Sequence, residues 1–439
     1  MNKQLCVISC PIDCYSGYSA RSRDLVKAIY ELKKDDWDIK IMSQRWGSTP
    51  WGFLDNNKEE WGWMKDLIMQ GNQLPKQPDV WMQITVPNEF QPIGKVNIGV
   101  TAGIETTIAD AAFILGCNKM DVTLVSSRHA KQVLEASKFQ EKDNTTQQVI
   151  RDIKLEKPVE VLFEGVDLNK YFAIADYDLE DTDLVLDLDT IEEDFCFLYV
   201  GHWLQGDLGE DRKNTGLLVK LFLETFKDKK KQPALIMKTS HGGASIMDRE
   251  EVLKKIDAIR DSVVGKNLPN IYLIHGDMDD EDINNLYNHP TVKAFVSLTK
   301  GEGYGRPLAE FCLSKKPVIT SGWSGHTDFL NPDFTVLLPG QLTPCHPSAY
   351  SQGLIIEGAS WFSVDPAATS KALVDVFENY KKYEELAKRQ GHKIKTEFNY
   401  DNMMLILNNY LDKYVPKQAA LALPKQVKLV LPKLKKISI

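Results

Sequence analysis

Short apolar runs alternate along the chain with longer segments whose apolar residues recur every three or four positions. The run at 4–10 is typical of a buried strand, and the segment 21–33 places Leu25, Ile29 and Leu32 on one helical face. Because strands that alternate with helices form parallel sheets, the pattern predicts an α/β fold. We expect strands at 4–10, 37–42, 95–100, 122–125, 159–163, 195–201, 234–238, 271–274, 293–298 and 317–320, and helices at 21–33, 130–137, 217–225, 307–315, 369–389 and 401–414.

An acidic stretch separates two series of predicted strands. Residues 176–194 contain ten Asp or Glu residues and no Lys or Arg, which predicts a solvated interdomain linker or exposed loop. We therefore expect a first α/β domain at 1–175, a linker at 176–194, a second α/β domain at 195–395, a C-terminal helix at 396–415 and a basic tail at 416–439. Two α/β units joined in this way predict a cleft between them, where small molecules usually bind.

Overall charge and cysteine content narrow the class of protein. The chain has 439 residues with a net charge of −8, which disfavours a nucleic-acid footprint over the whole surface. It contains no apolar run long enough to span a membrane and no signal peptide. An odd number of cysteines without such a signal predicts reduced thiols and a cytoplasmic protein.

Two patterns raise the question of a bound metal ion. Cys6, Cys10 and Cys14 have a spacing that fits no common metal or cluster site, so we expect small buried thiols. The acidic stretch contains D-x-D patterns at 176–178 and 187–189. A D-x-D that holds a metal belongs at a strand end beside a nucleotide, so we interpret these acids as solvated.

The densest chemical signal lies at 299–310, which follows a predicted strand and leads into a helix. Its glycines permit close backbone approach to a ligand, and Pro307 suits the start of a helix. The free N–H groups of that helix start form an anion site suited to a phosphate. Glu302 and Glu310 bracket the loop, and paired carboxylates bind the hydroxyls of sugars. A glycine-rich turn with a capping acid is the structural alternative.

The segment 302–310 reads E-G-Y-G-R-P-L-A-E, and it resembles the E-x7-E motif of GT-B glycosyltransferases of family 4, also called glycosyltransferase group 1. Gly165-Val166-Asp167, with Phe172, is similar to the G-V-D segment of that family. The resemblance spans 4–414. It implies two Rossmann-like domains that face a central cleft, an acceptor domain followed by a nucleotide-sugar domain. It also implies a retaining hexosyl- or pentosyltransferase that needs neither a metal ion nor another cofactor.

The resemblance also assigns residues. Glu302 and the backbone amides of Gly303, Tyr304 and Gly305 would hold the donor sugar, and Glu310 the ribose. Lys213 would bind the diphosphate and stabilise the leaving group. In the family, an arginine binds the diphosphate together with this lysine, and His202 occupies the position of that arginine here. Arg212 or Arg306 would substitute for the missing arginine. Further candidates are Gly17 in the loop after the first strand, Lys238 at a strand end, and Glu105, which faces the expected cleft and is otherwise a surface residue.

The acceptor is the least specified part of the reaction. Aromatic residues at 46–63 would stack on a sugar or a base, or pack in the core. The tail at 416–439 carries six Lys and no acid, so it would touch phosphates, anionic lipid or a partner protein. We expect a saccharide or lipid-linked acceptor, with modified DNA bases as an alternative. A second alternative is an inactive nucleotide-sugar-binding protein, because only one glycine remains at Gly17 and the basic partner is missing.

Overall fold

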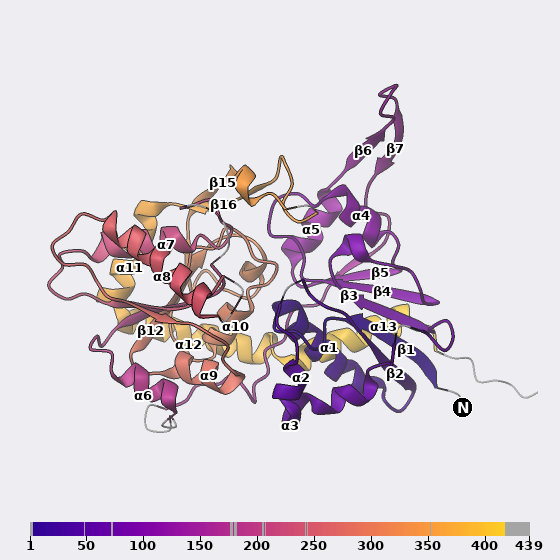
Figure 1. Ribbon diagram of the computed structural model, residues 1–439, viewed down its shortest axis with the longest axis horizontal. Helices are drawn as coiled ribbons and strands as arrows, with labels where there is room; N and C mark the ends of the chain where they lie inside the picture. The colour runs from indigo at the N-terminus through magenta and orange to yellow at the C-terminus, as the bar shows by residue number, and fades with distance from the viewer. Residues whose placement is uncertain are drawn as a thin grey trace, which may run out of the picture.

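The computed structural model describes residues 3–417 except 48, 72, 176–178, 180, 181, 204, 205, 207, 242, 244 and 352. The tail beyond residue 417 and the D-x-D pattern at 176–178 therefore lie outside the described residues. Two α/β domains lie side by side in Figure 1, and the C-terminal helices extend from the second domain back to the first.

The first domain is built on a parallel sheet with the strand order β2-β1-β3-β4-β5-β8. Its strands are β1 (Gln4–Cys10), β2 (Trp37–Ser43), β3 (Val80–Ile84), β4 (Val96–Thr101), β5 (Val122–Val125) and β8 (Val159–Val161). Its helices include α1 (Gly17–Lys33), α2 (Phe53–Asn56), α3 (Lys58–Trp61), α4 (Ala111–Cys117) and α5 (Arg128–Ala136), and a hairpin, β6 (Phe139–Lys142) and β7 (Val149–Ile153), projects outward (Figure 1). The short strand β3 was not predicted, because a polar, proline-rich stretch precedes it and only five residues form it.

The second domain repeats the architecture with the strand order β11-β10-β9-β12-β13-β14. Its strands are β9 (Cys196–Val200), β10 (Ala234–Lys238), β11 (Ile271–Ile274), β12 (Val292–Ser297), β13 (Val318–Ser321) and β14 (Val336–Leu338), beside a hairpin of β15 (Gly340–Pro344) and β16 (Ser360–Val364). Its helices include α7 (Thr215–Phe226), α8 (Ile246–Asp261), α9 (Asp280–Asn288), α10 (Arg306–Cys312) and α11 (Pro366–Glu378). The predicted α/β fold with parallel sheets is confirmed, and each sheet reverses its strand order at a point where ligands commonly bind.

The acidic stretch is not simply an exposed linker. Residues Asp183–Asp189 form helix α6, whose N-cap Thr182 accepts a hydrogen bond from the Val185 amide. Val185 and Leu188 are buried, and the helix packs against α9. The many acids of this stretch made its apolar positions hard to recognise in the sequence. Those apolar side chains face the second domain, while the carboxylates remain in solvent.

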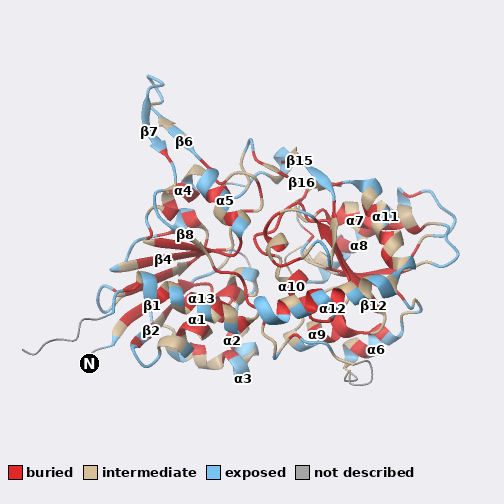
Figure 2. Ribbon diagram, turned by 180° about the vertical axis from the view of Figure 1, so that it is seen from behind, coloured by how far each residue is buried: buried red, intermediate tan, exposed pale blue. Residues whose placement is uncertain are grey.

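The C-terminal helices join the two domains. The predicted helix at 369–389 breaks at Asn379, and α12 (Tyr380–Glu397) continues to the boundary of α13 (Tyr400–Tyr414). The α13 helix returns to the first domain, where Tyr410 donates a hydrogen bond of 3.0 Å to the carbonyl of Val161. Figure 2 shows that both α12 and α13 carry buried residues. The chain therefore crosses between the domains a second time.

Candidate functional site

The glycine-rich motif forms the turn between β12 and α10 at the domain boundary. Gly305 caps the helix with a φ of 96°, in the left-handed region that favours glycine. A Cβ atom on Gly301 would lie 2.0 Å from the carbonyl oxygen of Glu105, and one on Gly303 would lie 2.4 Å from that of Ala102. These two glycines thus allow the motif to approach the backbone of the first domain. The sequence had associated them with the approach of a ligand.

Glu302 is buried between two cations that precede α7. Its Oε1 accepts a hydrogen bond of 2.6 Å from Lys213 Nζ, and its Oε2 lies 3.4 Å from Arg212 Nη1. Burial alone would raise the pKa of Glu302, but the charges of Lys213 and Arg212 outweigh it and lower the pKa to about 2. These cations do not form an exposed helix start, because the side chains of Arg212 and Lys213 are only 14% and 18% exposed.

Arg212 extends this cluster to the first domain. Its Nη2 lies 3.3 Å from Glu105 Oε1, and its Nη1 donates a hydrogen bond of 2.6 Å to the carbonyl of Gly301. Glu105 comes from the loop after β4, so the guanidinium connects a carboxylate of each domain. The structure therefore brings Glu105, Arg212, Lys213 and Glu302 together at one place.

The second glutamate of the motif lies in a separate ion cluster. Arg306 donates through Nε to Glu310 Oε1 at 2.7 Å, and through Nη1 to Asp24 Oδ2 of α1 at 2.6 Å. Burial raises the pKa of Glu310 to about 7, although the charge of Arg306 opposes that rise. Each glutamate of the motif is thus joined through an arginine to a carboxylate of the first domain.

The remaining predicted residues occupy different positions around these clusters. Gly17 is the first residue of α1, and no atom lies within 4 Å of a Cβ atom built on it. Lys238 ends β10 at the cleft, and its pKa is lowered by burial. The ring of Tyr304 packs in the core, 4.9 Å from that of Phe329, so only its backbone is free to face a donor sugar.

His202 takes the place expected for an arginine. Its Nδ1 lies 3.3 Å from Ser240 Oγ, after the end of β10. Burial lowers the pKa of His202, and the charges of Lys213 and Lys238 lower it further. Three groups able to carry positive charge therefore meet at the carboxyl edge of the second sheet.

Lys300, which precedes the motif, was not predicted as a site residue. The side chain is buried, lies 4.1 Å from the centre of the Trp361 ring and donates a hydrogen bond to the carbonyl of Gly209. Burial lowers the pKa of Lys300 to about 8. Its backbone amide also donates to the carbonyl of Arg212 at 2.8 Å, so Lys300 fixes the loop that carries Arg212 and Lys213. The sequence signal that could have indicated this role was a lysine that follows an apolar strand.

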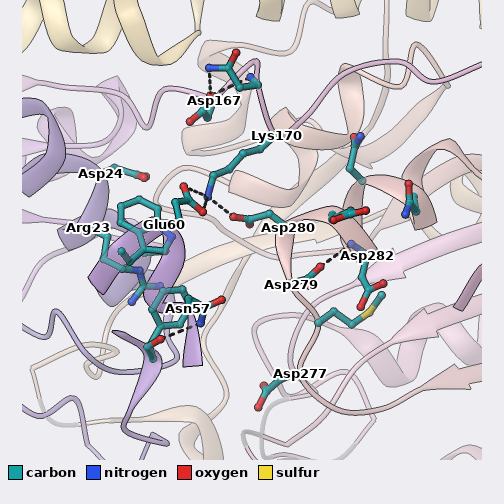
Figure 3. Close-up of a pocket in the computed structure, with 18 of the residues that line it drawn as sticks. Arg23, Asp24, Asn57, Glu60, Asp167, Lys170, Asp277, Asp279, Asp280 and Asp282 are labelled. Atoms are coloured by element: carbon teal, nitrogen blue, oxygen red, sulfur yellow. Dashed lines mark hydrogen bonds and ion pairs between the residues drawn. The ribbon is translucent and has the colours of Figure 1, made fainter. Parts of the chain in front are cut away.

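A cavity of about 1270 Å³ opens between the domains beside these clusters. In Figure 3, Lys170 reaches across it and contacts both Glu60 and Asp280, at 2.7 and 2.6 Å. The lining carries nine carboxylates and five cationic side chains, namely Asp24, Glu59, Glu60, Asp167, Asp277, Asp279, Asp280, Glu281 and Asp282 with Arg23, Lys58, Lys170, Lys238 and Arg306. Tyr15, Phe53, Trp61 and Phe172 add aromatic surface. The cavity is therefore acidic overall. Arg23 covers the Phe53 ring at 3.4 Å, so the exposed ring of Phe172 is the better face for a sugar to stack on.

The part of the chain that the structure describes contains no group of three His, Cys, Asp or Glu side chains placed to hold a metal ion. All seven cysteines are free and buried, as predicted for Cys6, Cys10 and Cys14. None of the described helices has the length and apolar character needed to cross a membrane.

Comparisons with known proteins agree on the architecture. No protein-family model matches the chain, and no curated protein matches it in sequence. Among solved structures, a glycosyltransferase from Rickettsia africae has a TM-score of 0.62 at 13% identity, over 94% of this chain and 99% of that one. Sucrose-phosphate synthase from Thermosynechococcus elongatus gives 0.59 at 12% identity, with the same coverage of both chains. Anabaena HepE in complex with UDP-glucose gives 0.60 at 12%, over 93% of this chain and 99% of that one.

These similarities define the fold. The chain has the GT-B architecture, in which two Rossmann-like domains face a central cleft. At 11–13% identity the comparisons concern architecture, and function has to be argued from the residues of the cleft.

Proposed function

We propose that this protein is a retaining, metal-independent glycosyltransferase of family 4 that takes its sugar from a nucleotide-sugar donor. The observation that carries the proposal is the buried contact of Glu302 with Lys213 and Arg212 at the cleft of a GT-B fold. HepE, a structure of similar architecture, was solved with UDP-glucose bound, and this makes UDP-glucose a reasonable first donor to test.

The proposed chemistry follows from the charges in the site. A sugar that leaves a nucleotide diphosphate passes through an oxocarbenium-like state while negative charge grows on the phosphate. Lys213 stabilises that charge, with His202 and Lys238 close by. The start of α10 is not the open anion site that the sequence predicted, because Leu308 and Ala309 donate their amides to the carbonyl of Gly305 and Pro307 has no N–H group. Glu302 remains ionised and orients the hydroxyls of the sugar. In a front-face attack with retention, the departing phosphate accepts the proton of the acceptor hydroxyl.

The acidic cavity supports a saccharide or a lipid-linked saccharide as acceptor. Carboxylates hydrogen-bond to hydroxyl groups, and Phe172, which is 46% exposed, offers an aromatic face for stacking. A nucleic acid brings one negative charge per nucleotide, which the excess of carboxylates in the cavity would repel. The cavity therefore favours a neutral or cationic acceptor over modified DNA.

A thermal-shift screen with UDP-, GDP- and ADP-sugars tests the donor. A ligand at 100 times its Kd stabilises the native state by about 2.7 kcal/mol, so the correct donor raises the Tm. Release of free sugar or its transfer to a saccharide panel then distinguishes the enzyme from an inactive binding protein. Donor binding without any turnover would favour the inactive alternative.

Glu302→Ala tests the assignment of the site. We expect the variant to remain folded, to lose transfer and to lose the donor-induced rise in Tm. Glu135→Ala is the control, because Glu135 forms a loose ion pair of 3.9 Å with Lys131 on α5, away from the motif. Unchanged turnover in Glu302→Ala would overturn the proposed function.

A further inference from the structure

Asp24 is an acidic residue of α1 for which the sequence suggested no role. It lies in the middle of the helix, and only 9% of it is exposed. The neighbouring arginines of α1 are engaged elsewhere. Arg21 donates to the carbonyl of Leu162 at 2.6 Å, and Arg23 donates to the carbonyls of Ile12 and Cys14 at 3.1 and 3.0 Å.

The partner of the Asp24 carboxylate therefore comes from the other domain. Within the described part of the chain, its ion pair is with Arg306, the first residue of α10, at 2.6 Å. The same guanidinium holds Glu310 at 2.7 Å through a different nitrogen atom. A planar guanidinium with several donors can bridge two carboxylates in fixed directions, which a lysine cannot do. The position of Arg306, and with it the orientation of Glu310, thus depends on Asp24.

The Glu310 carboxylate has one oxygen available to a ligand, which makes its contact with Arg306 and Asp24 relevant to donor binding. Its Oε1 accepts the bond from Arg306, while its Oε2 accepts no hydrogen bond from the residues that the structure describes. Both Asp24 and Arg306 line the cavity between the domains. A ligand hydroxyl that reaches Glu310 would meet a carboxylate with one oxygen held in place and the other available.

We propose that Asp24 is a positioning residue of the donor site, which acts across the domain boundary through Arg306 to hold Glu310 ready for the ribose hydroxyls of a nucleotide-sugar. The inference rests on the proposed function, and it adds to the donor site a first-domain residue beyond Glu105. It also explains why a buried carboxylate is present in the middle of α1, where it requires a charged partner.

The proposal predicts that loss of Asp24 weakens donor binding and leaves the rate of the chemical step unchanged. Ribose contacts are made equally in the ground state and the transition state, so their loss raises KM and leaves kcat unchanged. Asp24 also sets the charge around Glu310. Burial is the main cause of the raised pKa of Glu310, Arg306 opposes it, and the negative charges of Asp280 and Asp24 add to it. Removal of the Asp24 charge therefore lowers the pKa of Glu310.

The test is Asp24→Asn, measured by calorimetric binding of UDP-glucose across the neutral pH range and by steady-state kinetics. We expect Kd and KM to rise about 5- to 10-fold, as for the loss of one well-placed hydrogen bond, with kcat within about twofold of the wild type. The pH at which UDP-glucose affinity is half-maximal moves to lower values. Arg306→Lys should reproduce the rise in KM, and Asp24→Glu should restore most of the affinity.

Asp412→Asn is the control, since Asp412 pairs with Lys33 at the far end of α1, at 3.3 Å and outside the cleft. A lower Tm in Asp24→Asn with wild-type Kd and an unmoved pH profile would show that Asp24 only joins the domains, and would overturn the inference while the proposed function stood. If Asp24→Asn fails to fold, wild-type KM in Arg306→Lys overturns it equally. A wild-type chain that binds none of the UDP-, GDP- and ADP-sugars overturns the proposed function and this inference together.

Discussion

Single residues in this cleft derive their chemistry from their immediate partners. Glu302 and Glu310 belong to the same motif, yet the pKa of the first falls to about 2 and that of the second rises to about 7. Both carboxylates are buried, so burial does not account for the difference. Glu302 has two cations beside it, whereas Glu310 shares one arginine with Asp24. We therefore expect Glu302 to be ionised at all physiological pH values and Glu310 to titrate near neutrality.

Lys213→Ala tests the stabilisation of the leaving group. Removal of one donor that faces developing negative charge typically lowers kcat by about 10²- to 10³-fold. We expect a loss of that size, measured as steady-state turnover of the donor found in the screen. The loss of charge also frees Glu302, whose pKa rises. Lys220→Ala, on α7 beyond the cleft, provides the control and should keep full activity. Equal kinetics for the two variants would remove Lys213 from the mechanism.

Glu310→Gln tests the titration of the second glutamate. The folded-state pKa of Glu310 lies above the ordinary value of 4.5, so the native protein binds this proton more tightly than the unfolded chain does. The resulting stabilisation is fully present below about pH 4.5 and is lost as the pH rises through about 7. Glu310→Gln lacks this titration. The Tm of the wild type should therefore fall relative to the Tm of Glu310→Gln as the pH rises across that interval. A constant difference would show that Glu310 does not titrate there.

At the scale of elements, the motif loop is shaped by its contact with the first domain. The β12–α10 turn presses against the loop after β4, where a Cβ atom on Gly303 would meet the carbonyl of Ala102. Lys300 and the β15–β16 hairpin support the same turn from the other side, since the amide of Phe362 donates to the carbonyl of Lys300 at 2.9 Å. The loop is thus held in place before any donor arrives.

Gly303→Ala and Gly17→Ala test whether each glycine is needed for packing between the domains or for the approach of a ligand. The clash at Gly303 involves a backbone carbonyl, which cannot move aside as a flexible side chain can, so we expect a loss of about 1–3 kcal/mol in unfolding free energy. Gly17→Ala adds a methyl group to open space, so the stability should hold. Denaturant titration measures both variants. A loss of donor affinity in the stable Gly17→Ala would indicate that the donor occupies that space, and wild-type stability in Gly303→Ala would contradict the close contact.

At the scale of the whole molecule, one hydrophobic cluster extends across both domains, beside the separate clusters inside each domain. Aromatic rings form a chain from the motif to the first domain, from Tyr304 to Phe329, Phe398 and Phe163, with centroid distances of 4.9, 6.1 and 5.1 Å. The α13 helix buries Met403, Leu407 and Leu411 against the first domain and so ties the end of the second domain to it. The position of the cleft therefore depends on α13, which also contacts the Asp24 cluster, since Tyr400 Oη donates a hydrogen bond of 3.3 Å to the carbonyl of Asp24.

Leu407→Ala tests this helix. Leu407 is fully buried, and truncation of such a leucine costs about 2–5 kcal/mol because it leaves a cavity. We expect a lower denaturation midpoint, with donor affinity reduced because the cleft loses its support. Leu405→Ala lies two residues away and is 60% exposed, so it should stay within about 0.5 kcal/mol of the wild type. Equal stability of the two variants would mean that α13 does not hold the domains together.

The sequence by itself determined the α/β class, the two successive domains and the motif that contains Glu302 and Glu310. Those features follow from local periodicity and from residue spacing within one turn, which neighbouring residues encode. It missed β3, because five residues after a proline-rich stretch give little periodic signal, and it interpreted the apolar positions of α6 as part of a solvated linker.

Tertiary structure alone decided which charges meet. Asp24 and Arg306 are separated by 282 positions, and Arg212 and Glu302 by 90, so no local pattern could pair them. The same holds for Gly303, whose missing side chain matters because a loop of the other domain packs against it. Burial and ion pairing set the chemistry of the two motif glutamates, and both depend on how the domains close together.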